Sequence, residues 1–323
     1  MPKKTVVMVA ETSLTIEEAF REFIGEKITS GVAPKTIRNY EQSFQYFMEL
    51  ELDENYDFPI GELYKVYILQ WIDTMQRRKM KVVTMNSYLR VMRVFLYWCM
   101  DTERKYIDAP YKINLIKGED TLPKVFDGDE VELLLAKPTS TKDFVEWRTW
   151  AIANWIVATG DRASTICGYK ISDLNFKEKE IKKRHLKSKK AEIRPLSHAL
   201  EGIMKTYIRV CRSRVGEDAW LFPSNTEEQL TYNALAHSFT RYCKERGTKT
   251  HNVHALRHYF ATVYARESGD IERLRRLLGH STYAMTKRYL ELTDEDLRKD
   301  FDMRNPLDRM TVKRARTKKV EME

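Results

Sequence analysis

Apolar residues recur at helical spacing through the first third of the chain. The first such stretch opens with Thr15 and Glu18, a capping box in which each side chain can bond the other residue's backbone amide. The apolar positions between Ile16 and Ile24 then fall on one face of a helix. Further amphipathic stretches follow at residues 34–48, 68–75 and 85–99. Four such helices with short connections predict a small helical bundle.

The helical pattern lapses between Leu115 and Lys124, which makes this segment the best linker candidate. Helical spacing returns after Asp127, but residues 173–196 show short alternating stretches around a lysine-rich turn, and these predict strands. The other predicted helices lie at 143–158, 198–214, 232–246, from His254 onward and at 271–278. The pattern therefore predicts a mainly α protein with a small β-sheet, an α+β fold.

Length and composition fit a globular protein of about two domains. The chain has 323 residues, of which 42% are hydrophobic and 32% charged. No apolar run approaches the ~18 residues of a membrane span, and residues 6–10 are too few for a signal peptide, so we expect a cytoplasmic protein. The four cysteines lack metal-ligand or redox spacing, which suits a reducing compartment; Cys99 falls on an apolar helix face and is expected to be a buried free thiol.

Positive charge is in excess, with a formal net charge of +9. This favours a nucleic-acid-binding protein without deciding the matter, because many basic proteins bind no nucleic acid. Basic residues gather along the N-terminal helices, where a solvated helix face and a DNA-facing surface are equally good explanations. The candidate DNA-binding residues are Lys35, Arg77, Arg78, Lys79, Lys81, Arg90 and Arg93.

Four side chains toward the C-terminus have the chemistry needed to attack a phosphodiester. His254 and Arg257 lie three apart on a predicted helix and so project from one face, and His280 follows the end of another helix. The Tyr289 hydroxyl has an ordinary pKa of about 10, so it attacks only when its proton is drawn off and its target is polarised. Each residue alone also fits a surface, capping or packing role. His258, next to Arg257, is expected to point elsewhere and to be structural.

Together these residues resemble the tyrosine recombinase (lambda-integrase-like) family. The family motif T-G-x-R matches residues 159–162, H-x-x-R matches residues 254–257, and L-G-H-S matches residues 278–281. The family's nucleophilic tyrosine lies nine positions beyond the histidine, a spacing that Tyr289 has and Tyr283 lacks. Such an ordered set of motifs is far more specific than any one of them.

The resemblance also implies a catalytic lysine on a β-hairpin, ahead of a Pro-Leu pair that here is residues 195–196. Aligning on that pair selects Lys187, although Lys189 and Lys190 lie in the same turn and stay open as alternatives. Any of the three lysines would serve as an acid for the leaving oxygen.

Two positions near the first arginine depart from the family pattern. The family usually has an acidic residue three positions after that arginine, but Thr165 stands there, so the support of Arg162 is open. Asp173 is a candidate substitute. Asp161 occupies a position that is often apolar in relatives, and its carboxylate could pair with a basic group.

The resemblance implies an organisation of domains over about residues 14–300. It predicts an N-terminal extension (1–13), a four-helix SAM-like core-binding domain that binds DNA (14–112), a linker (113–124), a tyrosine recombinase catalytic domain (125–303) and a basic C-terminal tail (304–323). Seven basic residues and only Asp308 as an acid lie between Arg304 and Lys319, so the tail could contact DNA or a neighbouring subunit.

The implied function is site-specific DNA recombination without a metal or other cofactor. Tyr289 would form a 3′-phosphotyrosyl link, Arg162 and Arg257 would hold the non-bridging oxygens, and Lys187 would protonate the 5′-oxygen. His254 would act in acid/base chemistry and His280 would hydrogen-bond the phosphate. The expected partners are a double-stranded recombination site, further subunits forming a tetramer on DNA, and accessory DNA-bending proteins.

Two other functions use similar residues. A type IB topoisomerase-like enzyme would nick and reseal DNA without exchanging strands, and a regulator with an inactive recombinase fold would bind DNA without cutting it. Within the family, the absence of an additional arm-type DNA-binding domain favours an Xer-like resolvase or the recombinase of a small mobile element.

Overall fold

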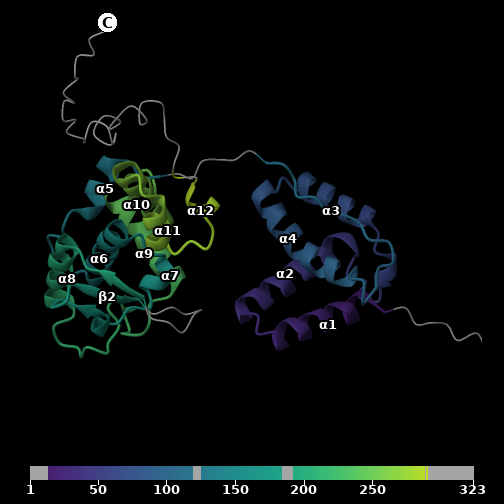
Figure 1. Ribbon diagram of the computed structural model, residues 1–323, viewed down its shortest axis with the longest axis horizontal. Coiled ribbons are helices and arrows are strands. Elements are labelled where there is room, and N and C mark those ends of the chain that lie inside the picture. The colour runs from purple at the N-terminus through teal and green to yellow at the C-terminus, as the bar shows by residue number, and fades with distance from the viewer. Residues whose placement is uncertain (1–13, 119–124, 184–191, 288, 290–323) are drawn as a thin grey trace, which may run out of the picture. The chain divides into compact units, whose positions relative to one another are not determined.

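The computed structural model describes residues 14–118, 125–183, 192–287 and 289. The chain divides into two compact units after residue 121 (Figure 1). Helices make up the described part of the N-terminal unit, and the C-terminal unit adds a three-stranded sheet to its helices. The predicted α+β class is therefore confirmed.

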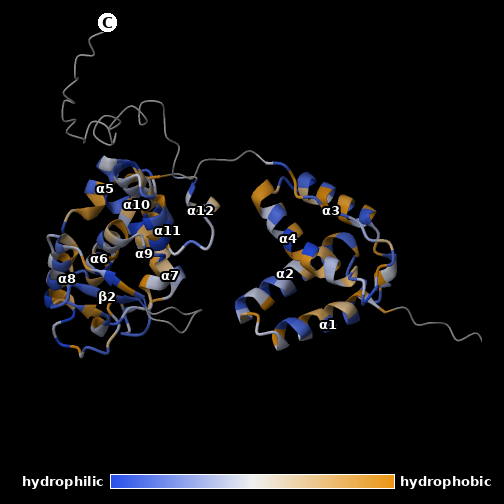
Figure 2. Cartoon of the chain, viewed as in Figure 1, coloured by the Kyte–Doolittle hydropathy of each residue, from blue (hydrophilic) through white to orange (hydrophobic). Residues whose placement is uncertain are grey.

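The N-terminal unit is the helical bundle that the apolar pattern predicts. It contains α1 (Ile16–Thr29), α2 (Pro34–Glu51), the 3-10 turn η1 (Ile60–Glu62), α3 (Lys65–Arg77) and α4 (Val82–Cys99). Both hydrophobic and hydrophilic residues lie along each of the four α-helices (Figure 2). Helix α2 packs against α1, α3 and α4. The Phe20 ring stacks on Phe44 with centroids 3.8 Å apart and meets Phe95 edge-on at 5.2 Å. These aromatic contacts join α1, α2 and α4 in one core.

The C-terminal unit is larger and is organised around a helix in the middle of its sequence. Its helices are α5 (Gly128–Leu135), α6 (Phe144–Thr159), α7 (Ala163–Ile166), η2 (Ile171–Asp173), α8 (His198–Cys211), α9 (Tyr232–Glu245), α10 (Val253–Ser268), α11 (Ile271–Leu278) and α12 (Ala284–Lys287). Helix α6 packs against α5, α8, α9 and α10. Such a helix has to be apolar on all sides, which explains the tryptophan-rich stretch of its sequence.

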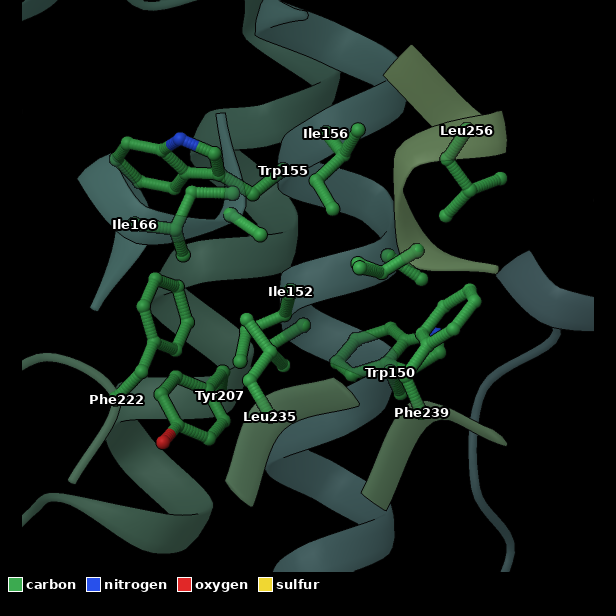
Figure 3. Packing of buried hydrophobic residues seen from close by; sticks show 14 of the residues in the cluster. Trp150, Ile152, Trp155, Ile156, Ile166, Tyr207, Phe222, Leu235, Phe239 and Leu256 are labelled. Atoms are coloured by element: carbon green, nitrogen blue, oxygen red, sulfur yellow. The ribbon is translucent and has the colours of Figure 1, made fainter. Parts of the chain in front are cut away.

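Figure 3 shows how this central helix is covered. In this view Trp155 of α6 lies on the side of Ile166 of α7 and Ile156 on the side of Leu256 of α10, while Ile152 lies toward Tyr207 of α8 and Leu235 of α9. Every residue of α6 from position 147 to 156 is buried. Because α6 ends at the turn that carries Arg162, this core fixes one wall of the candidate site.

Three short strands form an antiparallel sheet in the order β1 (Leu174–Asn175), β2 (Glu180–Lys183) and β3 (Glu192–Pro195). Ile181 pairs with Leu174 on one side and with Arg194 on the other. The strands lie where the alternating pattern predicts them. The lysine-rich turn between β2 and β3 falls outside the described residues, and with it Lys187, Lys189 and Lys190.

Two glycines shape the turns that bear the family motifs. Gly160 ends α6 with φ of 65°, and a Cβ there would stand 2.3 Å from the Phe260 ring. Gly279 ends α11 with φ of 61°. Since this left-handed conformation strains other residues, glycine suits both positions. At Gly160 the close approach of Phe260 excludes any side chain.

The composition led to expectations about the Cys99 thiol and about membrane spans. Cys99 is a free, fully buried thiol, as predicted, and burial raises its pKa above the ordinary range. Across the described ranges, no helix has both the length and the apolar character required to cross a membrane.

Candidate active site

Arg257 is the buried centre of the candidate site, with a relative exposure of 3%. It lies on α10 and donates hydrogen bonds to the carbonyl oxygen of Gly160 at 2.6 Å and to that of Leu278 at 2.7 Å. Its Nη2 also lies 3.1 Å from Nε2 of His280. One guanidinium therefore holds together the ends of α6 and α11 and the histidine that follows α11.

His280 lies just past the C-terminus of α11, as its spacing predicts. Its ring is buried, with Nδ1 2.9 Å from the hydroxyl oxygen of Thr286, which is itself fully buried. The backbone amide of His280 donates to the carbonyl of Arg275 at 3.1 Å and so closes the helix end. The residue thus caps α11 and presents an oriented imidazole to Arg257.

Arg162 also contacts the C-terminal end of α11. It follows the glycine turn after α6, is half-buried, and donates through Nη2 to the carbonyl of Gly279 at 3.4 Å. Burial, and then the nearby charge of Arg162, lower the pKa of Arg257 to about 10. Two guanidiniums and one imidazole therefore meet at the C-terminal end of α11, an arrangement suited to a phosphate oxyanion.

Tyr289 directs its hydroxyl toward α10. The hydroxyl oxygen lies 2.8 Å from Nδ1 of His258, and the Tyr289 ring is nearly parallel to the His280 ring at 6.4 Å between centroids. The expectation that His258 points away from the site is therefore wrong. The sequence held a usable signal, because residues four apart share a helix face and His258 follows His254 by four.

His254 occupies the first turn of α10 and is exposed. Its ring meets that of His258 edge-on, with centroids 5.3 Å apart. The two rings form a short row that leads from the protein surface to the Tyr289 hydroxyl. Of the sequence-derived candidates, the structure brings Arg162, His254, Arg257, His280 and Tyr289 into one region.

Asp161 does pair with basic groups, as its charge predicted, but those groups lie on the sheet. The carboxylate is 1% exposed and lies 2.5 Å from Nζ of Lys183 on β2 and 3.9 Å from Nη1 of Arg194 on β3. It also accepts hydrogen bonds from the Trp155 indole at 3.1 Å and the Tyr169 hydroxyl at 2.8 Å. Burial alone would raise its pKa, but Lys183 and Arg194 lower it overall.

Arg194 extends this buried network to the active-site helix. Its guanidinium donates to the carbonyl of Arg276 at 3.1 Å and to that of Leu277. The turn bearing Arg162, strands β2 and β3 and the end of α11 are therefore linked through buried charged groups. We refer to Asp161, Lys183 and Arg194 as the buried charge network.

The open question of what supports Arg162 has a partial answer. Asp173 is buried, and its carboxylate accepts a hydrogen bond from the Lys170 amide at 2.9 Å, which caps the 3-10 turn η2. Arg162 itself is anchored on the Gly279 carbonyl. The backbone of the neighbouring Asp161 is in turn fixed by the buried charge network.

Replacing Asp161 by Asn is expected to lower the free energy of unfolding by about 3 kcal/mol, because Lys183 would stay buried without the carboxylate that lies 2.5 Å from it, while Arg194 would keep its ion pair with Glu192. The pKa of Asp161 is lower in the folded protein than in an unfolded chain. Its contribution is thus complete above the unfolded value of about 3.9 and is lost as the pH falls from there through the folded value.

Urea unfolding of both proteins, at neutral pH and across the acid range, measures this effect. Asp218→Asn is the matched control, since Asp218 pairs with Lys170 from an exposed position. An unchanged urea midpoint for Asp161→Asn would contradict the prediction.

The candidate DNA-binding residues of the N-terminal unit lie on its surface. Lys35 is exposed on α2, and the residues between Arg77 and Lys81 form the connection from α3 to α4. Arg90 is exposed on α4, and Arg93 packs over the Tyr97 ring at 5.5 Å. Arg77 also pairs with Asp73 at 2.7 Å, so part of its charge is neutralised.

Comparison with protein families decides the class of the protein. The model described as "Phage integrase family" matches residues 124–296, which is more than half of the chain. The chain belongs to the phage integrase family. This integrase-family protein is therefore a tyrosine recombinase, an enzyme that breaks and rejoins DNA at specific sites, and the topoisomerase-like alternative is not favoured.

Relatives of this integrase-family protein are similar over nearly their whole length. Tyrosine recombinase XerC of Haemophilus influenzae (strain PittEE) is 24% identical over 282 residues, which cover 87% of this chain and 94% of that protein. Tyrosine recombinase XerD of Chlamydia muridarum is 24% identical over 300 residues, which cover 90% and 95%.

Solved structures share the fold of this integrase-family protein. The Tn1549 transposon integrase in complex with transposon right end DNA aligns with a TM-score of 0.73 at 20% identity, covering 90% of this chain and 99% of that one. A lambda integrase tetramer bound to a Holliday junction aligns with a TM-score of 0.68 at 18% identity, covering 86% and 78%. At these identities the likeness concerns the fold.

Proposed function

We propose that Tyr289 is the nucleophile and that Arg162, Arg257 and His280 bind the scissile phosphate. The observation that carries this assignment is the meeting of these side chains at the C-terminal end of α11. The Tyr289 hydroxyl oxygen attacks phosphorus, the bond from phosphorus to the 5′-oxygen breaks, and a 3′-phosphotyrosyl link results. The link retains the energy of the phosphodiester, so rejoining needs no nucleotide.

The two arginines suit the phosphate because a planar guanidinium can bond two oxygens and stays charged. His280 joins them when its Nε2 exchanges Arg257 for a phosphate oxygen, while Thr286 keeps the ring oriented. Lys187 is proposed as the acid that protonates the leaving 5′-oxygen, and His254 takes part in acid/base chemistry.

The N-terminal unit is proposed to bind the DNA backbone through its basic surface. Lys and Arg side chains that contact phosphates position a protein on DNA without reading its sequence. The exposed Lys35 and Arg90 and the segment from Arg77 to Lys81 are the candidates. Their contribution would weaken steeply as the salt concentration rises.

We further propose that several copies of the chain act together on two DNA duplexes in the cytoplasm. The solved lambda integrase is a tetramer on a Holliday junction, and exchange between duplexes requires more than one active subunit. The biological role is either resolution of the kind that Xer relatives suggest or the movement of a small mobile element. Accessory DNA-bending proteins and contacts made by the basic tail belong to the same proposal.

One experiment separates the possible activities. The purified protein is incubated with two duplexes that carry DNA flanking its gene, one of them labelled, and with a supercoiled plasmid. Labelled product that joins the two duplexes supports recombination. Relaxation of the plasmid without exchanged product would point to a topoisomerase-like enzyme, and binding without any cleavage would point to a regulator.

A further inference from the structure

Within the described residues, His258 is a polar side chain at the Tyr289 hydroxyl that the family motifs do not account for. Its ring is 9% exposed, and Nδ1 lies 2.8 Å from the tyrosine oxygen. The ring centroids of His258 and Tyr289 are 5.7 Å apart and the rings are tilted by 42°, so the contact is made through the polar atoms.

The attacking hydroxyl must lose its proton as it bonds to phosphorus. Its ordinary pKa of about 10 means that the proton does not leave unaided near neutral pH. A general base has to lie within hydrogen-bonding reach of that proton, about 2.6–3.2 Å, and imidazole is the side chain whose ordinary pKa best suits the task. His258 meets the distance criterion.

The other histidines are less well placed for this step. Both ring nitrogens of His280 lie beside other groups, Nε2 beside Arg257 and Nδ1 beside the Thr286 hydroxyl. His254 is exposed, and its ring meets the His258 ring edge-on with centroids 5.3 Å apart. It could pass a proton to or from His258.

We propose that His258 is the general base that activates Tyr289. On attack, the O–H bond of Tyr289 breaks and its proton moves to Nδ1 of His258, while the oxygen of Tyr289 bonds to phosphorus. The bond from phosphorus to the 5′-oxygen breaks, and that oxygen takes a proton from the separate acid. When the strand is resealed, Tyr289 leaves phosphorus and recovers its proton from His258. This assignment rests on Tyr289 being the nucleophile.

Two substitutions separate basicity from positioning. His258→Leu removes both the hydrogen bond and the proton acceptor. His258→Asn places an amide oxygen close to the position of Nδ1, so it keeps an acceptor for the hydroxyl but takes up no proton. We expect both variants to lose covalent complex formation by about 10²–10⁴-fold on a nicked suicide substrate.

A second substrate tests which side of the reaction is affected. When sulfur replaces the bridging 5′-oxygen, the leaving group departs without protonation, so a variant that lacks the acid regains its rate. The His258 variants should stay slow on this substrate, because their defect lies in the attacking group. His198→Asn, an exposed histidine at the start of α8, is the control and should match the unsubstituted protein.

The outcomes are distinct from failure of the proposed function. If Tyr289→Phe still forms the covalent complex, the nucleophile is misassigned and both proposals fall. If Tyr289→Phe is inactive but His258→Asn cleaves within threefold of the unsubstituted rate, His258 is not the base. Recovery of the His258 variants on the sulfur substrate would place His258 on the leaving-group side and would also overturn the inference. Thermal unfolding and DNA binding of each variant establish that it is folded. If His258→Leu does not fold, His258→Asn alone tests the inference.

Discussion

Tyr289→Phe is expected to abolish covalent capture of DNA, with a loss on the order of 10⁴-fold or more, because the phenyl ring offers no oxygen to phosphorus. DNA binding should stay nearly unchanged, since the proposed phosphate-binding residues Arg162, Arg257 and His280 are all retained. The measurement is the yield of protein linked to a labelled, nicked suicide substrate, separated under denaturing conditions.

Tyr283→Phe is the matched control for this loss. Tyr283 lies six residues earlier, is exposed, and does not have the family spacing. The Tyr283→Phe variant should form as much covalent complex with the suicide substrate as the unsubstituted protein. Capture that persists in Tyr289→Phe and disappears in Tyr283→Phe would transfer the nucleophile to Tyr283.

Arg257→Lys is expected to damage both the fold and the reaction. A single ammonium cannot bond the Gly160 and Leu278 carbonyls and also present two donors to a phosphate. One buried carbonyl left without its donor lowers the free energy of unfolding by about 1–3 kcal/mol. Loss of a fixed charge at the phosphate should slow cleavage by about 10²–10³-fold.

Denaturant unfolding and single-turnover cleavage measure the two effects separately. Arg266→Lys is the control, because Arg266 is an exposed arginine near the end of the same helix. A variant Arg257→Lys that unfolds normally but cleaves slowly would indicate that Arg257 acts on the phosphate alone. If Arg257→Lys cleaved at the normal rate, Arg257 would not be part of the active site.

The order of the helices and strands could be predicted from the sequence because each element carries a local pattern. The capping box at Thr15 and the repeated apolar face of α1 are contained within one stretch of chain. The predicted helix at 143–158 corresponds to α6, but its burial on every side depends on the helices packed around it. The four-residue helices α7 and α12 were not predicted, because one turn is too short to show a period.

For the candidate site, the sequence motifs predicted which residues take part but not how those residues contact one another. The resemblance to the family names Arg257 and Tyr289 as candidates, but it could not show that Thr286 orients His280 or that Asp161 reaches two strands far along the chain. Those contacts depend on tertiary packing. The sequence-based expectation for His258 is wrong because His258 shares a helix face with His254, four residues earlier, and its ring meets that of His254.

The positive charge gathered at the end of α11 has a consequence for the enzyme without DNA. The pKa of Arg257 is lowered in the folded protein, first by burial and then by the nearby charge of Arg162. Arg194 adds a further guanidinium at the same helix end. Carbonyl oxygens and the carboxylates of Asp161 and Glu192 compensate this repulsion. If the proposed phosphate binding is right, a DNA phosphate supplies negative charge at this helix end, so DNA bound there should stabilise the folded C-terminal unit against unfolding.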